Sequence, residues 1–593
     1  MTLQNSVGPR TDFADFQHAK KYRGEGESFR DAMGRVAGAL QDTPEHYQAF
    51  RAVLLDQRFM PAGRVQSAIG SSKNVTAYNC FVSGSIEDSF VDGRGSIMDR
   101  AMEAATTMRM GGGIGYDFST IRPRGELIKK LKSRATGPVS FMRIFNEVGL
   151  CTSSTDHRRG AQMGVLRVDH PDIREFVHAK QKDGALTGFN MSVGITDEFM
   201  RALDRADDSF DLRFEGRVYD TISARALWDE IMRCTWDWAE PGVLFIDIIN
   251  DDNNLRHCET IAATNPCGEQ PLPPYGACLL GSFNLVKYLR EGQGYEDLGD
   301  GREGQVRTWT FDYDAYIADV PEVVRAMDNV VDRTTYPLYE QEKEAKAKRR
   351  MGLGVTGLAN ALEALGHPYG SPGFIASQHE VLRILRDEAY RASALLAKEK
   401  GPFPLWSLGD FQLTAMWPRL PDDVKELIRA HGLRNSHLTS IAPTGTISLC
   451  ADNVSSGCEP VYAYSVRRTY QTFEGPRETM LEDYGYAFLG TRGRRTRDCS
   501  VSDHLAVLKA CVPYIDSAIS KTVNVEGSVS WEEFKEVYRE MWRARVKGGT
   551  TFRKDGKRFG IMSDEDDAGE VAAPQYGSAC VIDPQTGQRD CGE

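Results

Sequence analysis

The chain has 593 residues, of which 41% are hydrophobic and 26% are charged, and its formal net charge is −12 at pH 7. Because a single hydrophobic core usually stops growing at roughly 250–300 residues, we expect one large elaborated domain or several smaller ones. The acidic balance argues against a protein that coats DNA or RNA, although a local basic pocket for nucleotide phosphates is still allowed.

The sequence carries no recognisable signal for export or membrane insertion. It begins MTLQNSVGPRTDFADF, and its longest strongly apolar run is GVLFIDII at 242–249, which is too short to span a bilayer. A cytoplasmic protein is therefore predicted. In that setting the 12 cysteines favour catalytic or redox use over structural disulfides, and no CxxC pair suggests a zinc ribbon.

The first half of the chain predicts helices followed by an α/β core. Residues 26–60 have apolar residues at helical spacing in FRDAMGRVAGALQD and HYQAFRAVLLDQRFM. From about 76 to 285, strand-like runs such as MGVLRVDH and GFNMSVGIT alternate with helical stretches such as SARALWDEIMRCTWDWA. The Gly-rich, charged segment 291–307 is predicted to be a surface loop or hairpin.

The second half predicts further helices over 320–400, then a strand and a Gly/Thr turn in LTSIAPTGTISLCA at 438–451. The polar residues 562–593 are predicted to form a mobile tail. GLGVTG at 352–357 matches the GxGxxG dinucleotide motif, but the charged helical run EKEAKAKRR precedes it where the motif needs a buried strand. We therefore expect a tight helix-packing turn there.

Two glycine-containing segments are candidates for phosphate or sugar binding. GGGIG at 111–115 brings backbone close to a ligand in some proteins, although glycine clusters are more often plain turns. APTGTIS at 442–448 has the composition of an anion-binding nest, with a simple hydroxyl-capped turn as the alternative. Its hydroxyls and unhindered N–H groups come from Thr444, Gly445, Thr446 and Ser448.

The stretch TNPCGEQPLPPYGAC at 264–278 places a thiol between an amide and a carboxylate. If the segment is extended, Asn265, Cys267 and Glu269 point to one face, and four nearby prolines stiffen the backbone. An isolated cysteine is more often a small buried hydrophobe. A nucleophilic cysteine would need a histidine, such as His257, whereas a thiyl radical would not.

These residues resemble the active-site loop of ribonucleotide reductases, whose signature is N-x-C-x-E on a finger loop inside a ten-stranded α/β barrel. The resemblance extends over five ordered motifs. They are RFMPAG…TAYNCFVSG at 58–84, RRGAQMGVLRVDHPDIREFV with FNMSVGITDEFM, NPCGEQPLPPYGACLLGSFNL, RRMGLGVTGLA and APTGTIS.

The resemblance implies a role for each residue of the stretch. Cys267 would be the thiyl radical that abstracts the 3′-hydrogen of a ribonucleotide, Glu269 would accept the 3′-hydroxyl proton, and Asn265 would hydrogen-bond the sugar. Cys80 and Cys278 would donate two electrons and end as a disulfide. The substrate would also contact Asn79, Gly112, Gly113, Pro443, Thr444, Gly445, Thr446 and Ser448.

The resemblance is strongest to the class that uses adenosylcobalamin. The oxygen-dependent class passes its radical through two adjacent tyrosines, and this sequence has 22 tyrosines but no Tyr-Tyr pair. The anaerobic class uses a glycyl radical, for which RDCGE at the C-terminus is a poor match. No corrinoid motif adds support. The alternative is an oxygen-dependent catalytic subunit that needs a separate radical-generating subunit; a regulatory protein without chemistry and a cysteine hydrolase are less favoured.

The same resemblance predicts the organisation and partners. Residues 1–75 would form an N-terminal helical segment, too short for the family's ATP-cone, and 76–560 the barrel, with the finger loop near 262–280. The tail, 561–593, would carry electrons through Cys580 and Cys591 from a thioredoxin- or glutaredoxin-like reductant.

Regulation and assembly are also implied. A dNTP or ATP effector would bind near Asp88, Arg122 and the segment 182–190. No insertion that imitates a dimer partner is found, so a homodimer acting on ribonucleoside diphosphates is predicted, with no metal site of its own and no direct contact to nucleic acid or membrane.

Overall fold

The computed structural model describes residues 7–129, 131–152, 160–181, 185–297, 303–472, 475–553, 581–582 and 589–590. Its N-terminal part is helical, as predicted, and Ser28 caps the second helix with a capping box that includes Asp31. The helices are α1 (Asp12–Tyr22), α2 (Phe29–Leu40), α3 (Pro44–Leu55) and α4 (Gly63–Ala68). The strand β1 (Phe59–Pro61) interrupts them and ties this part of the chain to a sheet.

The main body is a mixed α/β structure around an eight-stranded sheet in the order β13-β2-β3-β6-β7-β10-β21-β20. Neighbouring strands from β2 to β10 run parallel, whereas β13 and β21 pair antiparallel with β2 and β10. The bounds are β2 (Cys80–Val82), β3 (Gly113–Asp117), β6 (Gln162–Arg167), β7 (Phe189–Ile195), β10 (Gly242–Phe245), β13 (Ala277–Cys278), β20 (Thr522–Val525) and β21 (Gly548–Arg553).

A three-stranded sheet, β1-β14-β17, lies next to it in the chain and in space. Its strands β14 (Leu280–Asn284) and β17 (Gly352–Thr356) are parallel, and only Leu279 separates β13 from β14. Two isolated parallel bridges, Leu353 with Thr439 and Ile441 with Ile519, lead from β17 toward the segment that contains β20.

The strands of the large sheet are buried on both faces, as expected for parallel strands between helices and a filled interior. On β3, Ile114 and Tyr116 face the helices, and the Tyr116 ring lies 4.8 Å from that of Phe145. Gly113 and Gly115 face the opposite side.

A separate apolar cluster fills that opposite side. It joins inward side chains of several strands to Ala263 and Leu272, which belong to a short hairpin of β11 (Ala263–Thr264) and β12 (Pro271–Leu272). The hairpin therefore lies on the face of the strands away from the helices.

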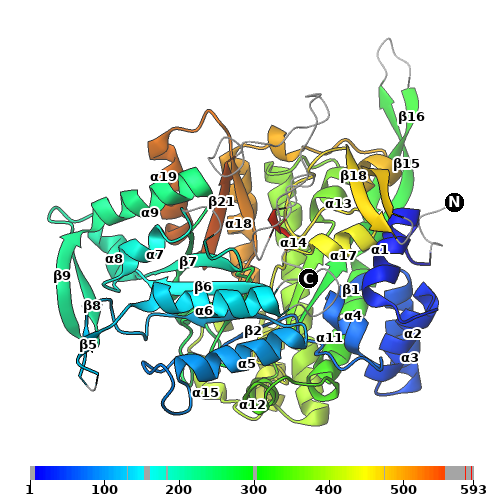
Figure 1. Ribbon diagram of the computed structural model, residues 1–593. Coiled ribbons are helices and arrows are strands. Elements are labelled where there is room, and N and C mark those ends of the chain that lie inside the picture. Colours follow the sequence, from blue (N-terminus) through cyan, green and yellow to red (C-terminus); the bar gives the residue numbers. More distant parts are fainter. Residues whose placement is uncertain are drawn as a thin grey trace.

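Helices cover the outer faces in two groups (Figure 1). Those packed on the large sheet are α5 (Ile97–Arg109), α6 (Pro138–Cys151), α7 (Ile173–Val177), α8 (Asp197–Ala202), α9 (Ala224–Trp238), α10 (Ile246–Asp251), α18 (Val501–Cys511) and α19 (Trp531–Arg543). Those grouped with the small sheet are α11 (Tyr313–Arg333), α12 (Tyr339–Lys348), α13 (Leu358–Ala364), α14 (Pro372–Lys400), α15 (Leu408–Phe411), α16 (Asp422–His431) and α17 (Gly445–Cys450).

Five two-stranded hairpins besides β11–β12 complete the described part. They are β4 (Leu127–Ile128) with β5 (Ser133–Arg134), β8 (Ser209–Phe214) with β9 (Arg217–Ser223), β15 (Leu289–Asp297) with β16 (Glu303–Phe311), β18 (Ser465–Thr472) with β19 (Gly475–Glu482), and β22 (Val581–Ile582) with β23 (Arg589–Asp590). The hairpin predicted at 291–307 is thus confirmed as β15–β16, which projects from the body in Figure 1.

The prediction for GLGVTG was wrong in one respect. Residues 352–356 form the buried strand β17 rather than a turn, and only Gly357, with φ +70°, turns the chain into α13. The strand needs its glycines because a Cβ at Gly354 would lie 2.2 Å from the carbonyl oxygen of Ser440. Close packing between backbones, and not dinucleotide binding, explains the motif.

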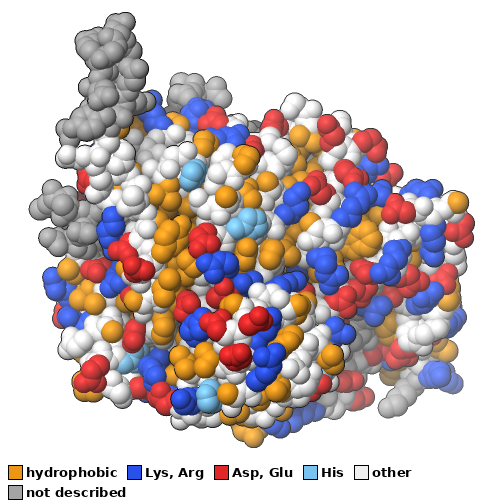
Figure 2. Space-filling view, turned by 180° about the vertical axis from the view of Figure 1, so that it is seen from behind, with side chains coloured by type: hydrophobic (Ala, Val, Ile, Leu, Met, Phe, Trp, Pro, Cys, Tyr) orange, Lys and Arg blue, Asp and Glu red, His pale blue; other side chains and the backbone are white. Residues whose placement is uncertain are grey.

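The surface carries charges of both signs. On the face seen in Figure 2, Lys and Arg side chains are interspersed with Asp and Glu, without a broad basic stripe. In the part of the chain that the structure describes, no helix combines the length and the apolar character that crossing a bilayer requires.

Candidate active site

The finger hairpin β11–β12 presents its tip as a tight turn. Asn265 occupies the first position, Pro266 the second and Gly268 the fourth, with a hydrogen bond of 3.1 Å from the Gly268 N–H to the Asn265 carbonyl. This is the residue pattern that type I turns favour. The expected extended alternation of Asn265, Cys267 and Glu269 was therefore wrong: a turn, and not strand periodicity, gathers the three groups at the tip.

The tip is held rigidly. The Asn265 N–H donates to the Gln270 carbonyl at 3.1 Å, and the Gln270 N–H donates to Asn265 Oδ1 at 3.0 Å. The Glu269 carbonyl accepts from the Ala518 N–H and from Ser440 Oγ, both at 2.9 Å. These bonds fix the loop from within and from the neighbouring strands.

Burial keeps water away from the tip. Asn265 and Glu269 are fully buried, and Cys267 is 4% exposed. The Pro266 carbonyl accepts a hydrogen bond of 2.9 Å from Asn190 Nδ2 on β7, which draws the turn toward the large sheet. A reactive species at Cys267 would thus be enclosed by protein.

Two further thiols lie beside the turn. Cys80 on β2 and Cys278 on β13 are directly opposite each other in the antiparallel ladder. Directly opposed residues have Cα atoms roughly 4.5–5.5 Å apart, which is within the range that a disulfide bridges. An added Cβ at Gly113 would lie 3.2 Å from Cys80 Sγ and 3.1 Å from Pro266 Cγ, so the cysteine pair and the finger turn share one interior.

Several buried polar atoms on the finger turn and on either side of β2 have no hydrogen-bond partner among the described residues. They are Asn265 Nδ2, both amide atoms of Asn79, and Ser83 Oγ. Because buried polar groups are nearly always satisfied, such atoms indicate where a polar ligand binds. Asn79 was predicted from the sequence. Ser83 was not predicted as a ligand-binding residue. In the sequence, only its position directly after the β2 segment could have suggested it.

The APTGTIS segment forms a hydroxyl cluster at the start of α17. Thr444 has φ +55°, and its Oγ1 accepts the Gly457 N–H at 2.8 Å. The hydroxyls of Thr444, Ser448 and Thr356 lie within 3.0–3.1 Å of one another. Thr356 was not predicted, because it belongs to β17, far away in the sequence.

The comparisons with known proteins identify this arrangement. A family model described as "Ribonucleotide reductase, barrel domain" matches residues 78–484 and 465–552. The chain belongs to the ribonucleotide reductase family.

Individual relatives extend over most of the chain. A vitamin B12-dependent ribonucleoside-diphosphate reductase of Mycobacterium tuberculosis (strain CDC 1551 / Oshkosh) is 32% identical over 91% of this chain and 77% of its own length. A protein of the same name from Thermoplasma acidophilum is 32% identical over 90% of this chain and 69% of its own length. A vitamin B12-dependent ribonucleotide reductase from Streptomyces clavuligerus is 29% identical over 91% of this chain and 62% of its own length.

The other predicted residues of this ribonucleotide reductase fall into three groups. Gly112 faces outward, where a Cβ would lie 2.7 Å from the Phe81 ring, so helix-side packing already requires glycine there. Asp88 and Arg122 bind each other, with 2.6 Å between Oδ2 and Nε. Cys580 and Cys591 lie outside the described residues, as do 182–184 of the predicted effector segment.

The histidine considered for a hydrolase faces elsewhere. His257 Nε2 lies 3.9 Å from the Asp410 carboxylate at α15. A base for the Cys267 thiol is therefore not supplied by this residue, which is consistent with radical chemistry in a ribonucleotide reductase.

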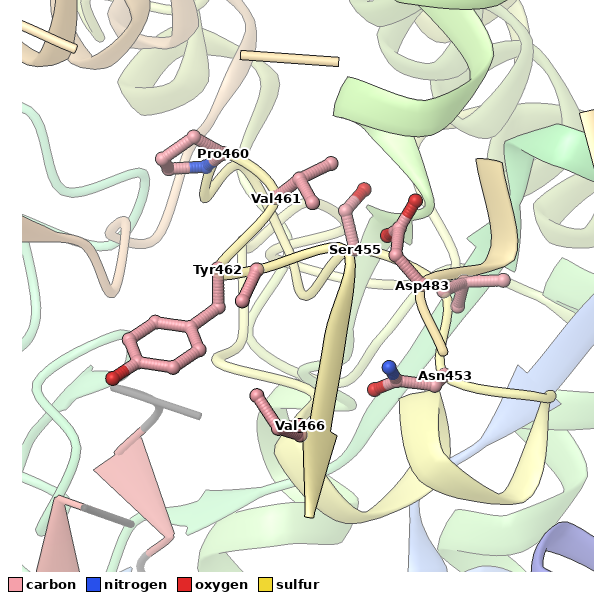
Figure 3. A pocket seen from close by; sticks show the side chains of 9 residues that line it. Asn453, Ser455, Pro460, Val461, Tyr462, Val466 and Asp483 are labelled. Atoms are coloured by element: carbon pink, nitrogen blue, oxygen red, sulfur yellow. The ribbon is translucent and has the colours of Figure 1, made fainter. Parts of the chain in front are cut away.

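Figure 3 shows a small pocket whose lining is linked to the hydroxyl cluster by a hydrogen bond. Asn453, Ser455 and Asp483 line it, and the Ser455 carbonyl accepts a hydrogen bond from Thr356 Oγ1 at 3.1 Å. Burial raises the pKa of Asp483 to about 6, although a hydrogen bond from Asn360 Nδ2 to the carboxylate acts to lower it. The pocket wall and the hydroxyl cluster are thus one connected structure.

Proposed function

We propose that this protein reduces ribonucleoside diphosphates to 2′-deoxyribonucleoside diphosphates, with adenosylcobalamin as the radical-generating cofactor. The observation that carries the proposal is the buried turn with Cys267 at its tip, beside the opposed cysteines Cys80 and Cys278. The printed names of the relatives, which are vitamin B12-dependent reductases, support the cofactor and the diphosphate substrate.

We further propose that the two sheets form one ten-stranded barrel around the finger hairpin. The continuous run β13–β14 pairs with β2 at one end and with β17 at the other. The bridges at 439 and 441 then link β17 through one more strand to the segment of β20. Counting β13–β14 and the segment 439–441 as one strand each, the ring β2-β3-β6-β7-β10-β21-β20-(439–441)-β17-(β13–β14) closes with ten strands.

Adenosylcobalamin, when bound, supplies the one-electron oxidant that removes the hydrogen atom from a thiol. The site fits such a cofactor in its chemistry, because Cys267 is a buried thiol that could give up a hydrogen atom away from water. A corrinoid would bring most of the ligands of its own metal. Among the described residues no group of three His, Cys, Asp or Glu is placed to hold a metal ion, and such a group is not needed.

The chain's own residues then act on the sugar. Cys267 abstracts the 3′-hydrogen, and Glu269, at the same tip, accepts the proton of the 3′-hydroxyl. Asn265 Nδ2 donates a hydrogen bond to a sugar oxygen, because its Oδ1 is already occupied by the Gln270 N–H. The rigid turn holds the three groups in position before the substrate arrives.

The reduction step uses the cysteine pair. The C2′–O bond breaks and the 2′-hydroxyl leaves as water, while Cys80 and Cys278 together give up two electrons and two protons and form an S–S bond. Their opposed positions on β13 and β2 allow that bond without movement of the strands. At the end of the cycle Cys267 returns the abstracted hydrogen to the 3′ carbon and is a thiyl radical again.

Re-reduction and regulation complete the proposal. We expect a thioredoxin- or glutaredoxin-like protein to reduce the pair through Cys580 and Cys591. In support, β22 and β23 pair as a hairpin next to these two positions, and β23 lies against α17. A homodimer with a dNTP or ATP effector near Asp88 and Arg122 is also proposed from the family resemblance.

The experiment is anaerobic turnover of purified protein with adenosylcobalamin, a dithiol and each ribonucleoside diphosphate. We expect deoxynucleotide formation by the wild type, and none by Cys267→Ser with nucleotide binding preserved. Turnover by Cys267→Ser would refute the role of that thiol. Activity only after addition of a separate radical-generating subunit would favour the oxygen-dependent alternative.

A further inference from the structure

We propose that Lys21, on the N-terminal helix α1, is a further substrate-binding residue whose ammonium group binds the phosphates of the nucleotide. The inference rests on the proposed function, and it takes the hydroxyl cluster at the start of α17, which the sequence predicts to bind an anion and to contact the substrate, as the phosphate site. It adds a residue from a part of the chain that none of the site motifs includes.

The first step is the anchoring of α1 beside α17. Just before the helix, the Arg10 and Thr11 N–H groups and the Thr11 hydroxyl donate to Asp452 Oδ1 at 2.9–3.0 Å. Asp452 follows α17 by two residues. The start of α1 is therefore tied to the end of the short helix that carries the hydroxyl cluster.

Apolar contacts continue along the helix. Phe13 shares a small cluster with Leu449 of α17 and Leu481 of β19. Its ring lies 5.2 Å from that of Tyr470 on β18, and Figure 1 shows α1 next to α17 and β18. At the other end of α1, Tyr22 packs so closely against α4 that a Cβ at Gly63 would lie 2.5 Å from its ring. Both ends of the helix are fixed.

Lys21 lies between these fixed ends, next to the phosphate site. Its Nζ is 3.4 Å from Thr446 Oγ1, and Thr446 is itself 2% exposed. The contact joins residues that are 425 positions apart, so only the tertiary fold creates it. The Thr446 hydroxyl accepts from the ammonium group and keeps its own hydrogen for a phosphate oxygen.

The negative charge of a diphosphate favours a cation beside the hydroxyl cluster. The hydroxyl and backbone N–H donors of the cluster are neutral, whereas a nucleoside diphosphate is a multiply charged anion, and charge-assisted hydrogen bonds are roughly twice as strong as neutral ones. The neighbouring Arg23 is already engaged: its guanidinium pairs with Asp15, and its Nε donates to His18 Nδ1 at 3.1 Å. Among the described contacts of α1, that of Lys21 with Thr446 brings a cation to the cluster.

The test compares Lys21→Met with Lys21→Arg, which keeps the charge, and with Lys20→Met, which removes the same charge from the adjacent position of the same helix. In steady-state turnover of the holoenzyme we expect Lys21→Met to raise KM for the diphosphate about tenfold with kcat within about twofold. Lys20→Met should leave KM unchanged, and Lys21→Arg should restore most of the loss.

Equilibrium dialysis separates this inference from the proposed function. The probes are the four ribonucleoside diphosphates and the corresponding nucleosides, which lack phosphates. We expect Lys21→Met to lose about tenfold in diphosphate affinity and nothing in nucleoside affinity. Equal losses for both probes, or no loss for either, would overturn the role of Lys21, whether or not the wild type proves to be a reductase.

Discussion

Gly115 illustrates how the site depends on a missing side chain. It lies on the inward face of β3, and a Cβ there would be 1.9 Å from the carbonyl oxygen of Thr264 on the finger hairpin. The obstacle is backbone, so no side-chain rotation relieves it. The finger hairpin can lie directly on β3 only because Gly115 has no side chain.

We predict that Gly115→Ala displaces the finger and abolishes reductase activity, with a loss of unfolding free energy of about 2 kcal/mol. Gly113→Ala, whose Cβ would meet Pro266, Cys80 and the Ala161 carbonyl at 3.1–3.3 Å, should be intermediate. Gly409→Ala, with no atom within 4 Å, is the control and should leave activity unchanged. Turnover and chemical denaturation check the order, and an active Gly115→Ala would contradict the proposed packing.

At the scale of elements, the hairpin β15–β16 has a base that packs on the protein and an outer part that projects from it. Its base is packed, since Trp309 is 8% exposed and Tyr288, just before β15, is fully buried. The Tyr288 hydroxyl also donates to Asp319 Oδ2 of α11 at 2.8 Å. The outer part projects beyond the body in Figure 1.

Replacing residues 294–306 by Asn-Gly would join the paired positions Gln293 and Arg307 through a two-residue turn. We predict that this change alters the unfolding free energy by less than about 0.5 kcal/mol and leaves turnover intact. Trp309→Ala at the base should instead cost about 3 kcal/mol. Thermal and denaturant unfolding measure both. A large loss on shortening would mean that the tip has contacts of its own.

At the scale of the whole molecule, stability depends on pH through buried carboxyl groups. Glu363 is 7% exposed, and burial raises the pKa of its carboxyl from 4.5 to about 7. Hydrogen bonds from the Tyr369 and Arg494 N–H groups to Oε1 work in the opposite direction. Because the folded pKa exceeds the unfolded one, this group's contribution to stability is fully present below about pH 4.5 and is lost as the pH rises through about 7.

We predict that Glu363→Gln, which keeps an acceptor for both N–H groups, gains stability relative to the wild type as the pH rises from 4 to 8. The expected change in the difference of unfolding free energies is about 3 kcal/mol. Denaturant unfolding of both proteins at several pH values measures it, and Glu426→Gln, at an exposed position of α16, serves as the control. A difference that does not vary with pH would show that the carboxyl group ionises normally in the folded protein.

The sequence predicted a large share of the fold and of the site, for reasons that particular residues make clear. The helices over 26–55 and the strands β6 and β7 follow from apolar spacing, which is a local property. Family resemblance then predicted the finger cysteine and the cysteine pair. The turn at Asn265 was misjudged because Asn-Pro-Cys-Gly was treated as an extended segment, although Pro at the second and Gly at the fourth position favour a turn.

By itself, the sequence determined that a thiol, a carboxylate and an amide lie within five residues of one another, and its family resemblance predicted their roles in the chemistry. Only the tertiary structure decided that Cys80 lies opposite Cys278, that Thr356 joins the hydroxyl cluster, and that Lys21 approaches Thr446. These contacts join residues 88–425 positions apart along the chain. No local periodicity encodes them, because they arise from the burial of whole elements against one another.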